Sequence, residues 1–162
     1  MGRQKRQRTG TSGELMIGLL EGFMWLDRGL QENLKARGLP HVRRLESMVM
    51  VYAAAGVQRP SELARQLGVT RQSINSAIRD LEGKDLIALA PDPQDRRCKI
   101  VELSNTGMPV HREAESILAA LARTLEERIG AEAVAMLSQI TGTDWGTPPL
   151  VVTANKKRRA HA

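Results

Sequence analysis

The sequence contains few cysteines, few histidines and no long hydrophobic run. The single cysteine, Cys98, excludes an internal disulfide, and His41, His111 and His161 are too scattered to form a metal-ligand motif. No stretch approaches the roughly 18 to 20 consecutive apolar residues that cross a bilayer, and no apolar secretion core follows the basic N-terminal residues. We therefore expect a cytoplasmic protein with no metal, no cofactor and no membrane partner.

The formal net charge of +6 is concentrated at the two ends of the chain. Two basic runs without acidic residues account for eight of the 24 lysines and arginines: Arg3, Lys5, Arg6 and Arg8 at one end, and Lys156, Lys157, Arg158 and Arg159 at the other. The rest of the chain contains the other 16 basic residues and all 18 acidic residues, which gives it a net charge of −2. The basic runs either bind phosphate through counterion release or act as solubilising disordered ends, and net charge says little about the folded body.

Helical periodicity dominates the chain from its first apolar residue. The first helix is expected from Thr11, whose hydroxyl can form a capping box with Glu14, to Gly38. Its apolar residues form two stripes, and at about 1.5 Å per residue it runs for nearly 40 Å. Because that length exceeds what a domain of this size needs for its own core, one face is expected to pack against a second copy of the chain.

The next segments predict two helices, a tight turn, a further helix and a hairpin. Helices are expected from Val42 to Gly56 and from Pro60 to Gly68, and a third begins at Thr70, a good N-cap residue. Strands are expected over 86–89 and 98–103, separated by a polar turn over 91–97. Helices near 108–130 and 134–140 complete a mainly α fold with a small β-hairpin (α+β).

The helix that begins at Thr70 has the polar outer face of a DNA reader. Its apolar residues Ile74, Ala77, Ile78 and Leu81 share one side. Arginine pairs in bidentate fashion with guanine, and glutamine and asparagine pair with adenine. The residues expected to face the major groove are Arg71, Gln72, Asn75, Ser76 and Arg79, with Thr70 and Ser73 available to phosphate oxygens. Any amphipathic surface helix also presents polar residues outward, so this helix alone does not decide the function.

The hairpin that follows strengthens the case for DNA. Its turn holds Asp92, Asp95, Arg96 and Arg97. At the tip of a projecting ribbon, a guanidinium can enter the narrow, negative minor groove beside a major-groove helix. An acidic residue beside it can fix its direction.

These segments together resemble the multiple-antibiotic-resistance regulator (MarR) family over about residues 12–141. The resemblance lies in Ser61-Glu62-Leu63-Ala64, Thr70-Arg71-Gln72-Ser73, Asp92-Pro93-Gln94-Asp95-Arg96-Arg97, Val101-Glu102-Leu103-Ser104 and Gly107. It implies a winged helix-turn-helix joined to a dimerisation region, with DNA affinity set by a small effector. It also implies that Arg97 enters the minor groove, that Asp95 orients it and that Arg96 lies near the DNA backbone. Ala88-Leu89-Ala90 departs from the family, whose members commonly carry a basic residue there.

Five segments are expected on this basis. They are a basic disordered arm (1–10), an N-terminal dimerisation helix (11–38), the winged helix-turn-helix domain (39–104), C-terminal dimerisation helices (105–141) and a basic tail containing proline and glycine (142–162).

The resemblance also implies an effector pocket between the dimerisation helices and the DNA-reading domain. The residues that it brings under consideration are Met24, Trp25, Arg28, His41, Arg44, Met48 and Tyr52. An aromatic acid or its coenzyme A thioester would suit apolar walls, with Arg28, His41 or Arg44 binding the carboxylate or phosphate. The alternative is that these residues are core, interface and surface. Cys98 is expected to be a small core residue of a wing strand, which disfavours oxidant sensing.

The sequence therefore predicts a bacterial homodimeric repressor, nucleoid-associated when bound, that grips a palindromic operator and is released by a small molecule. No nucleophile lies beside a paired base and no glycine-rich phosphate loop is present, so an enzyme is not expected. The alternative is a winged-helix protein-interaction module whose basic tails anchor it to nucleic acid.

Overall fold

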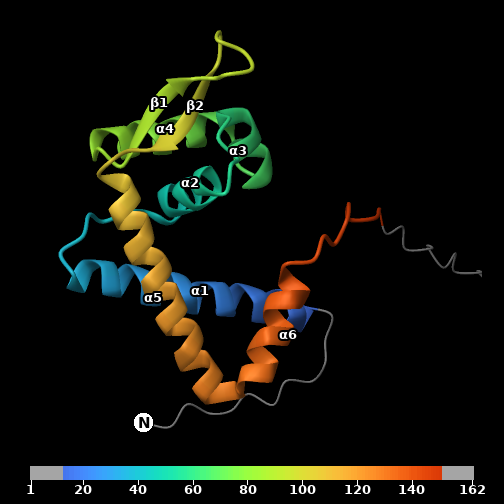
Figure 1. Cartoon of the computed structure of the whole chain (residues 1–162). Helices are drawn as coiled ribbons and strands as arrows, with labels where there is room; N and C mark the ends of the chain where they lie inside the picture. Colours follow the sequence, from blue (N-terminus) through green and yellow to red (C-terminus); the bar gives the residue numbers. More distant parts are fainter. Residues whose placement is uncertain (1–12, 151–162) are drawn as a thin grey trace, which may run out of the picture. The chain divides into compact units, whose positions relative to one another are not determined.

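The computed structural model describes residues 13–150, and this part of the chain forms six helices and one two-stranded hairpin (Figure 1). The elements are α1 (Gly13–Ala36), α2 (Arg44–Ala54), α3 (Pro60–Gln66), α4 (Arg71–Gly83), β1 (Ile87–Pro91), β2 (Lys99–Leu103), α5 (Gly107–Ile129) and α6 (Ala131–Thr141). The expected mainly α fold with a small hairpin is confirmed. Both basic runs and the expected Thr11 cap lie outside the described residues. No helix between residues 13 and 150 is long and apolar enough to span a bilayer.

The chain divides into two compact units, and the division falls between Thr124 and Leu125, inside α5. The main core of the first unit lies among α2, α3, α4 and the hairpin. Its fully buried side chains include Leu63, Ile74, Leu81, Leu86 and Val101. A smaller cluster joins α1 to α5 through Leu30, Leu34 and Ile117.

The helix pair α3–α4 is built by local signals that the sequence displays. Pro60 occupies the start of α3, where its missing N–H has no intrahelical partner to lose. Gly68 has a φ of +62°, which lets the chain turn sharply into α4. The Thr70 hydroxyl then accepts the Ser73 backbone N–H at 3.1 Å. The helix start at Thr70 is therefore confirmed, and α4 continues two residues past Leu81, to Gly83.

The hairpin pairs β1 and β2 antiparallel, with Leu89 opposite Val101. The Val101 N–H donates to the Gln58 carbonyl oxygen at 2.9 Å, which ties β2 to the segment just before α3. We call the hairpin together with its connecting loop, residues 92–98, the wing. It extends beyond the helices at the top of the view in Figure 1. Because β2 is fastened to the α2–α3 segment, the wing and α4 belong to one packed body.

Helix α5 begins one residue earlier than the sequence predicts. The Ser104 hydroxyl accepts the Gly107 N–H at 2.8 Å, so the serine does cap this helix. Pro109 fits because first-turn N–H groups need no partner within the helix. The backbone of Gly107 passes so close to the Leu86 carbonyl that an added Cβ would overlap it. This contact fixes the start of α5 against the hairpin.

The second unit contains the end of α5 and α6. Gly130, with a φ of +93°, separates the two helices as expected. Val134 is the buried residue of α6, whereas Met136, Leu137 and Ile140 are exposed. The Trp145 indole N–H donates to the Ile140 carbonyl oxygen at 2.9 Å, which holds the segment after α6 against its last turn.

Candidate DNA-binding interface

The outer face of α4 gathers most of the sequence-predicted DNA-binding residues. Ile74, Ala77, Ile78 and Leu81 are buried on the inner face. The side chains on the outer face are exposed, and they are Arg71, Gln72, Asn75, Ser76 and Arg79. The face therefore presents two guanidinium groups and two carboxamides in one solvent-facing row.

The start of α4 is partly occupied by its own capping contacts. Thr70 is exposed and Ser73 is half-buried, and their hydroxyl oxygens lie 2.9 Å apart. Because the Thr70 oxygen also accepts the Ser73 N–H, this threonine primarily fixes where the helix begins. The remaining first-turn N–H groups still favour an anion.

A basic pocket of about 300 Å³ adjoins the outer face of α4. It lies between the starts of α3, α4 and β2, and its lining consists of Arg59, Pro60, Ser61, Arg71, Asn75, Cys98 and Lys99. Neither Ser61 nor Lys99 is among the DNA-binding residues predicted from the sequence, although the sequence shows a serine in the first turn of a helix and a lysine shortly after the wing arginines. The hydroxyl and cationic groups of this lining are the types that bind phosphate oxygens.

The wing loop presents Arg96 and Arg97, both exposed, in the same compact unit as α4. Asp95 is also exposed, and its carboxylate accepts the Arg97 backbone N–H at 3.1 Å. Its carbonyl oxygen accepts the Cys98 N–H at 2.8 Å. Within the described part of the chain, Asp95 makes no ion pair with the Arg97 guanidinium, so it shapes the loop backbone that carries the arginine.

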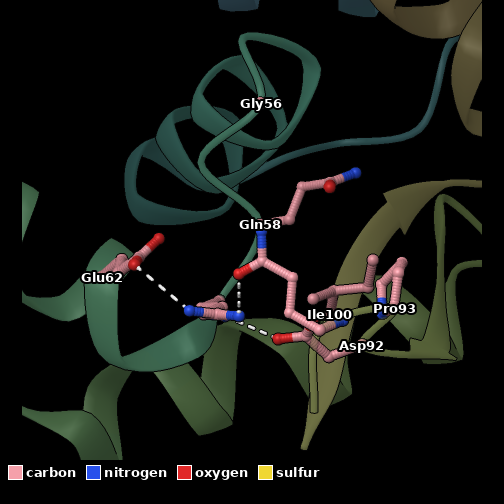
Figure 2. Close-up of a pocket in the computed structure, with 8 residues that line it drawn as sticks. Gly56, Gln58, Glu62, Asp92, Pro93 and Ile100 are labelled. Atoms are coloured by element: carbon pink, nitrogen blue, oxygen red, sulfur yellow. Dashed lines mark hydrogen bonds and ion pairs between the residues drawn. The ribbon is translucent and has the colours of Figure 1, made fainter. Parts of the chain in front are cut away.

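Asp92 does not lie at the wing tip, where the sequence suggested it. Only 2% of it is exposed, and its carboxylate accepts Arg59 Nε at 2.6 Å and the Gln94 N–H at 2.8 Å. The hydrogen bond from Arg59 is the main cause that holds the pKa of Asp92 below its usual value. Arg59 also donates to the Gln94 side chain at 2.8 Å. This cluster closes one side of a pocket of about 320 Å³ beneath the wing (Figure 2), and it anchors the wing to the start of α3.

Cys98 is exposed, so its expected place in the core is wrong. It lies at the end of the wing loop, one residue before β2 begins, so the in-and-out alternation of strand side chains does not apply to it. Its thiol lies 3.5 Å from the Asp95 carboxylate. That hydrogen bond and the negative charge of Asp95 raise the pKa of Cys98, which keeps the thiol protonated and poorly nucleophilic.

An apolar cavity of about 200 Å³ lies among α1, α2 and α5. Its lining is Leu30, Leu34, Val42, Ser47, Met50, Val51, Val110, His111, Ala114, Glu115 and Leu118. This is the region where an effector pocket was expected, but the seven suggested residues do not line the cavity. The α2 positions that do so are Ser47, Met50 and Val51, and helical geometry turns Met48 and Tyr52 to other sides.

The other suggested effector residues have different surroundings. Arg44 is bound to Asp27 at 2.8 Å, and its guanidinium lies 5.5 Å from the centre of the Phe23 ring. The remaining residues are exposed (Met24, Arg28 and His41) or half-buried (Trp25, Met48 and Tyr52). Helical periodicity alone could not indicate which side of α1 and α2 faces α5. Across residues 13–150, no group of His, Cys, Asp and Glu side chains could hold a metal ion.

The α3–turn–α4 pair and the adjoining wing define the winged helix-turn-helix class of DNA-binding proteins. The MarR family model matches residues 48–97, from α2 to the wing arginines. This segment is therefore similar to the DNA-binding part of MarR-family regulators. No curated protein sequence matches the chain significantly.

Solved structures share the fold. Wild-type apo MarR from Escherichia coli is 20% identical with a TM-score of 0.65, and the match covers 83% of this chain and 96% of that one. The regulator BldR from Sulfolobus solfataricus is 24% identical with a TM-score of 0.56, covering 81% and 97%. A mutant of MepR from Staphylococcus aureus is 19% identical with a TM-score of 0.59, covering 81% and 93%.

Proposed function

We propose that the chain is a homodimeric repressor that binds a palindromic operator and is released by a small molecule. The observation that carries the proposal is the polar outer face of α4 together with the exposed arginines of the wing on one packed domain. The major groove, about 12 Å wide, accepts a helix such as α4. The adjacent minor groove accepts an arginine such as Arg97.

The unpartnered apolar residues of α1 support a dimer. Leu15 and Met16 are 70% and 72% exposed, and Ile17 and Leu20 are exposed beside them. Contiguous apolar surface of this kind marks an interaction site, and a second copy would bury it. The exposed apolar residues of α6 offer a similar surface within their own unit.

The cavity among α1, α2 and α5 supports release by a small molecule. Its walls are mostly apolar, with His111, Glu115 and Ser47 as the polar groups. A volume of about 200 Å³ favours one aromatic ring or a short alkyl chain, so a coenzyme A moiety would have to remain outside. His111 could bind the carboxylate of an aromatic acid, whereas Glu115 would favour an amine.

The test is DNase footprinting and fluorescence-anisotropy titration on the DNA upstream of the chain's own coding sequence. A protected palindrome with half-sites about one helical turn apart is expected. Arg97→Ala should weaken binding, and Gln72→Ala or Asn75→Ala should relax base preference, since each good base pairing contributes about 1 to 3 kcal/mol. Arg123→Ala, which removes an exposed charge from α5, is the matched control and should bind normally.

Three outcomes of these experiments decide the proposal. An absence of protection would contradict operator binding and favour the protein-interaction alternative. Footprints unaffected by all three substitutions would contradict the assigned interface. For the effector, benzoate-like acids, their neutral amides and benzylamine-like amines are added separately, and the proposal of small-molecule release fails if none weakens binding at millimolar concentration.

A further inference from the structure

A buried carboxylate lies outside the DNA-binding face and has no part in the function described so far. Glu46, in the first turn of α2, is only 1% exposed. It accepts Lys84 Nζ at 2.5 Å, the Arg43 backbone N–H at 2.8 Å and Arg43 Nε at 2.7 Å. Three donors therefore converge on one carboxylate that is shielded from any direct contact with DNA.

The donors connect two parts of the chain that the sequence separates widely. Lys84 directly follows the last residue of α4, and its ammonium also donates to the His41 carbonyl oxygen at 2.9 Å. Arg43 is the N-cap residue of α2 and also pairs with Asp80 of α4. The cluster thus joins the C-terminal end of α4 to the segment that leads from α1 into α2.

The carboxylate is held charged in this place. Burial by itself would raise the pKa of Glu46, but hydrogen bonds from Lys84 and from the Arg43 backbone and side chain outweigh burial and leave the pKa below its usual value. A buried ion pair adds little net stability, yet removing one partner leaves the others uncompensated. The cluster is therefore stable in one arrangement and constrains where the end of α4 lies.

We propose that Glu46 is a positioning residue that, through Lys84 and Arg43, sets the angle of α4 in the major groove. The proposal rests on the DNA-reading role of α4 given above. Thr70 and Gly68 fix the start of this helix, and the Glu46 cluster fixes its end. Over 13 residues, or about 20 Å, a tilt of about 5° about the fixed start moves the end of α4 by nearly 2 Å and Arg79, about 12 Å along the helix, by about 1 Å. A shift of about 1 Å takes a hydrogen bond to a base edge out of its normal range of about 2.7 to 3.2 Å.

The test compares affinities for two duplexes: the protected operator and a scrambled sequence of equal length. Glu46→Gln keeps the shape of the side chain but removes its charge. We expect a roughly tenfold loss of operator affinity, about 1.4 kcal/mol, with scrambled-DNA affinity unchanged within about twofold. A purely structural role would lower the folded fraction and so reduce both affinities by the same factor. Equal losses, or no loss, would overturn the proposal.

Companion variants keep the result interpretable. Lys84→Met should reproduce the loss of operator preference, and Lys84→Arg should largely restore it. Glu82→Gln, which removes an exposed carboxylate from the same end of α4, should leave the preference unchanged. If Glu46→Gln fails to fold by circular dichroism, Lys84→Met decides, since Lys84 lies at the cluster's rim. A wild-type protein without operator preference would instead contradict the proposed function itself.

Discussion

Replacing Asp92 by asparagine should loosen the wing without altering the side chains proposed to contact DNA. Asparagine can still accept the Gln94 N–H, but its amide group cannot replace the carboxylate oxygen that accepts Arg59 Nε at 2.6 Å. A hydrogen bond between charged groups contributes about 1.5 to 3 kcal/mol. Because the Arg59 side chain is 36% exposed and can be partly rehydrated, we expect a loss of about 2 kcal/mol of unfolding free energy. In a chain of this length that loss lowers Tm by about 4 to 8 °C.

The effect of Asp92→Asn on operator affinity can be measured separately from its effect on the free energy of unfolding. If Asp92 serves to hold the wing in place, Asp92→Asn should weaken operator binding about tenfold in the wild-type background and hardly at all in Arg97→Ala, because the minor-groove contact is already gone. Urea unfolding gives the stability change, and anisotropy titration of the four proteins of the cycle gives the coupling. Glu102→Gln, which removes an exposed carboxylate from β2, is the control and should shift stability by less than about 0.5 kcal/mol.

Two results would refute this reasoning. Unchanged stability in Asp92→Asn would show that the Arg59 contact holds nothing in place. Additive effects of Asp92→Asn and Arg97→Ala on operator binding would show that the anchor does not act through the wing arginine.

Further outcomes follow from single contacts. Gly107→Ala should lower the unfolding free energy by about 3 kcal/mol, since its Cβ would overlap the Leu86 carbonyl; a near-neutral effect in urea unfolding would contradict the close approach. Thr70→Ala should cost about 1 kcal/mol through the lost N-cap, measured in the same way. Because the Cys98 thiol stays protonated, peroxide should change the DNA affinity of Cys98→Ser and of wild type equally. A loss of DNA affinity in wild type alone would show that the thiol is reactive. Folding lowers the pKa of Glu46, so its carboxylate stabilises the folded state at pH values above the ordinary pKa of 4.5. This stabilisation is lost as the pH falls through the pKa of the folded state. In urea unfolding at a series of acidic pH values, Glu46→Gln should therefore lose less unfolding free energy than wild type does.

The elements of the fold and the polar outer face of α4 could be read from the sequence because their signals are local. Proline at the start of α3, glycine in the turn and threonine at the start of α4 each act on neighbouring backbone groups. The apolar side of α4 repeats at helical spacing, which leaves the polar residues on the outside whatever the helix packs against. The same local turn chemistry placed Arg97 in an exposed loop.

The amino-acid sequence by itself thus determined the order of helices and strands and the chemistry of the face that α4 presents. Only the tertiary structure decided which charged side chains are buried and which groups they pair with. Asp92 and Glu46 look like solvent-exposed acids in the sequence, and they are buried because Arg59 and Lys84, 33 and 38 residues away, reach them. Likewise, the cavity depends on which sides of α1, α2 and α5 meet. Burial and ion pairing depend on contacts between distant segments, which no local pattern encodes.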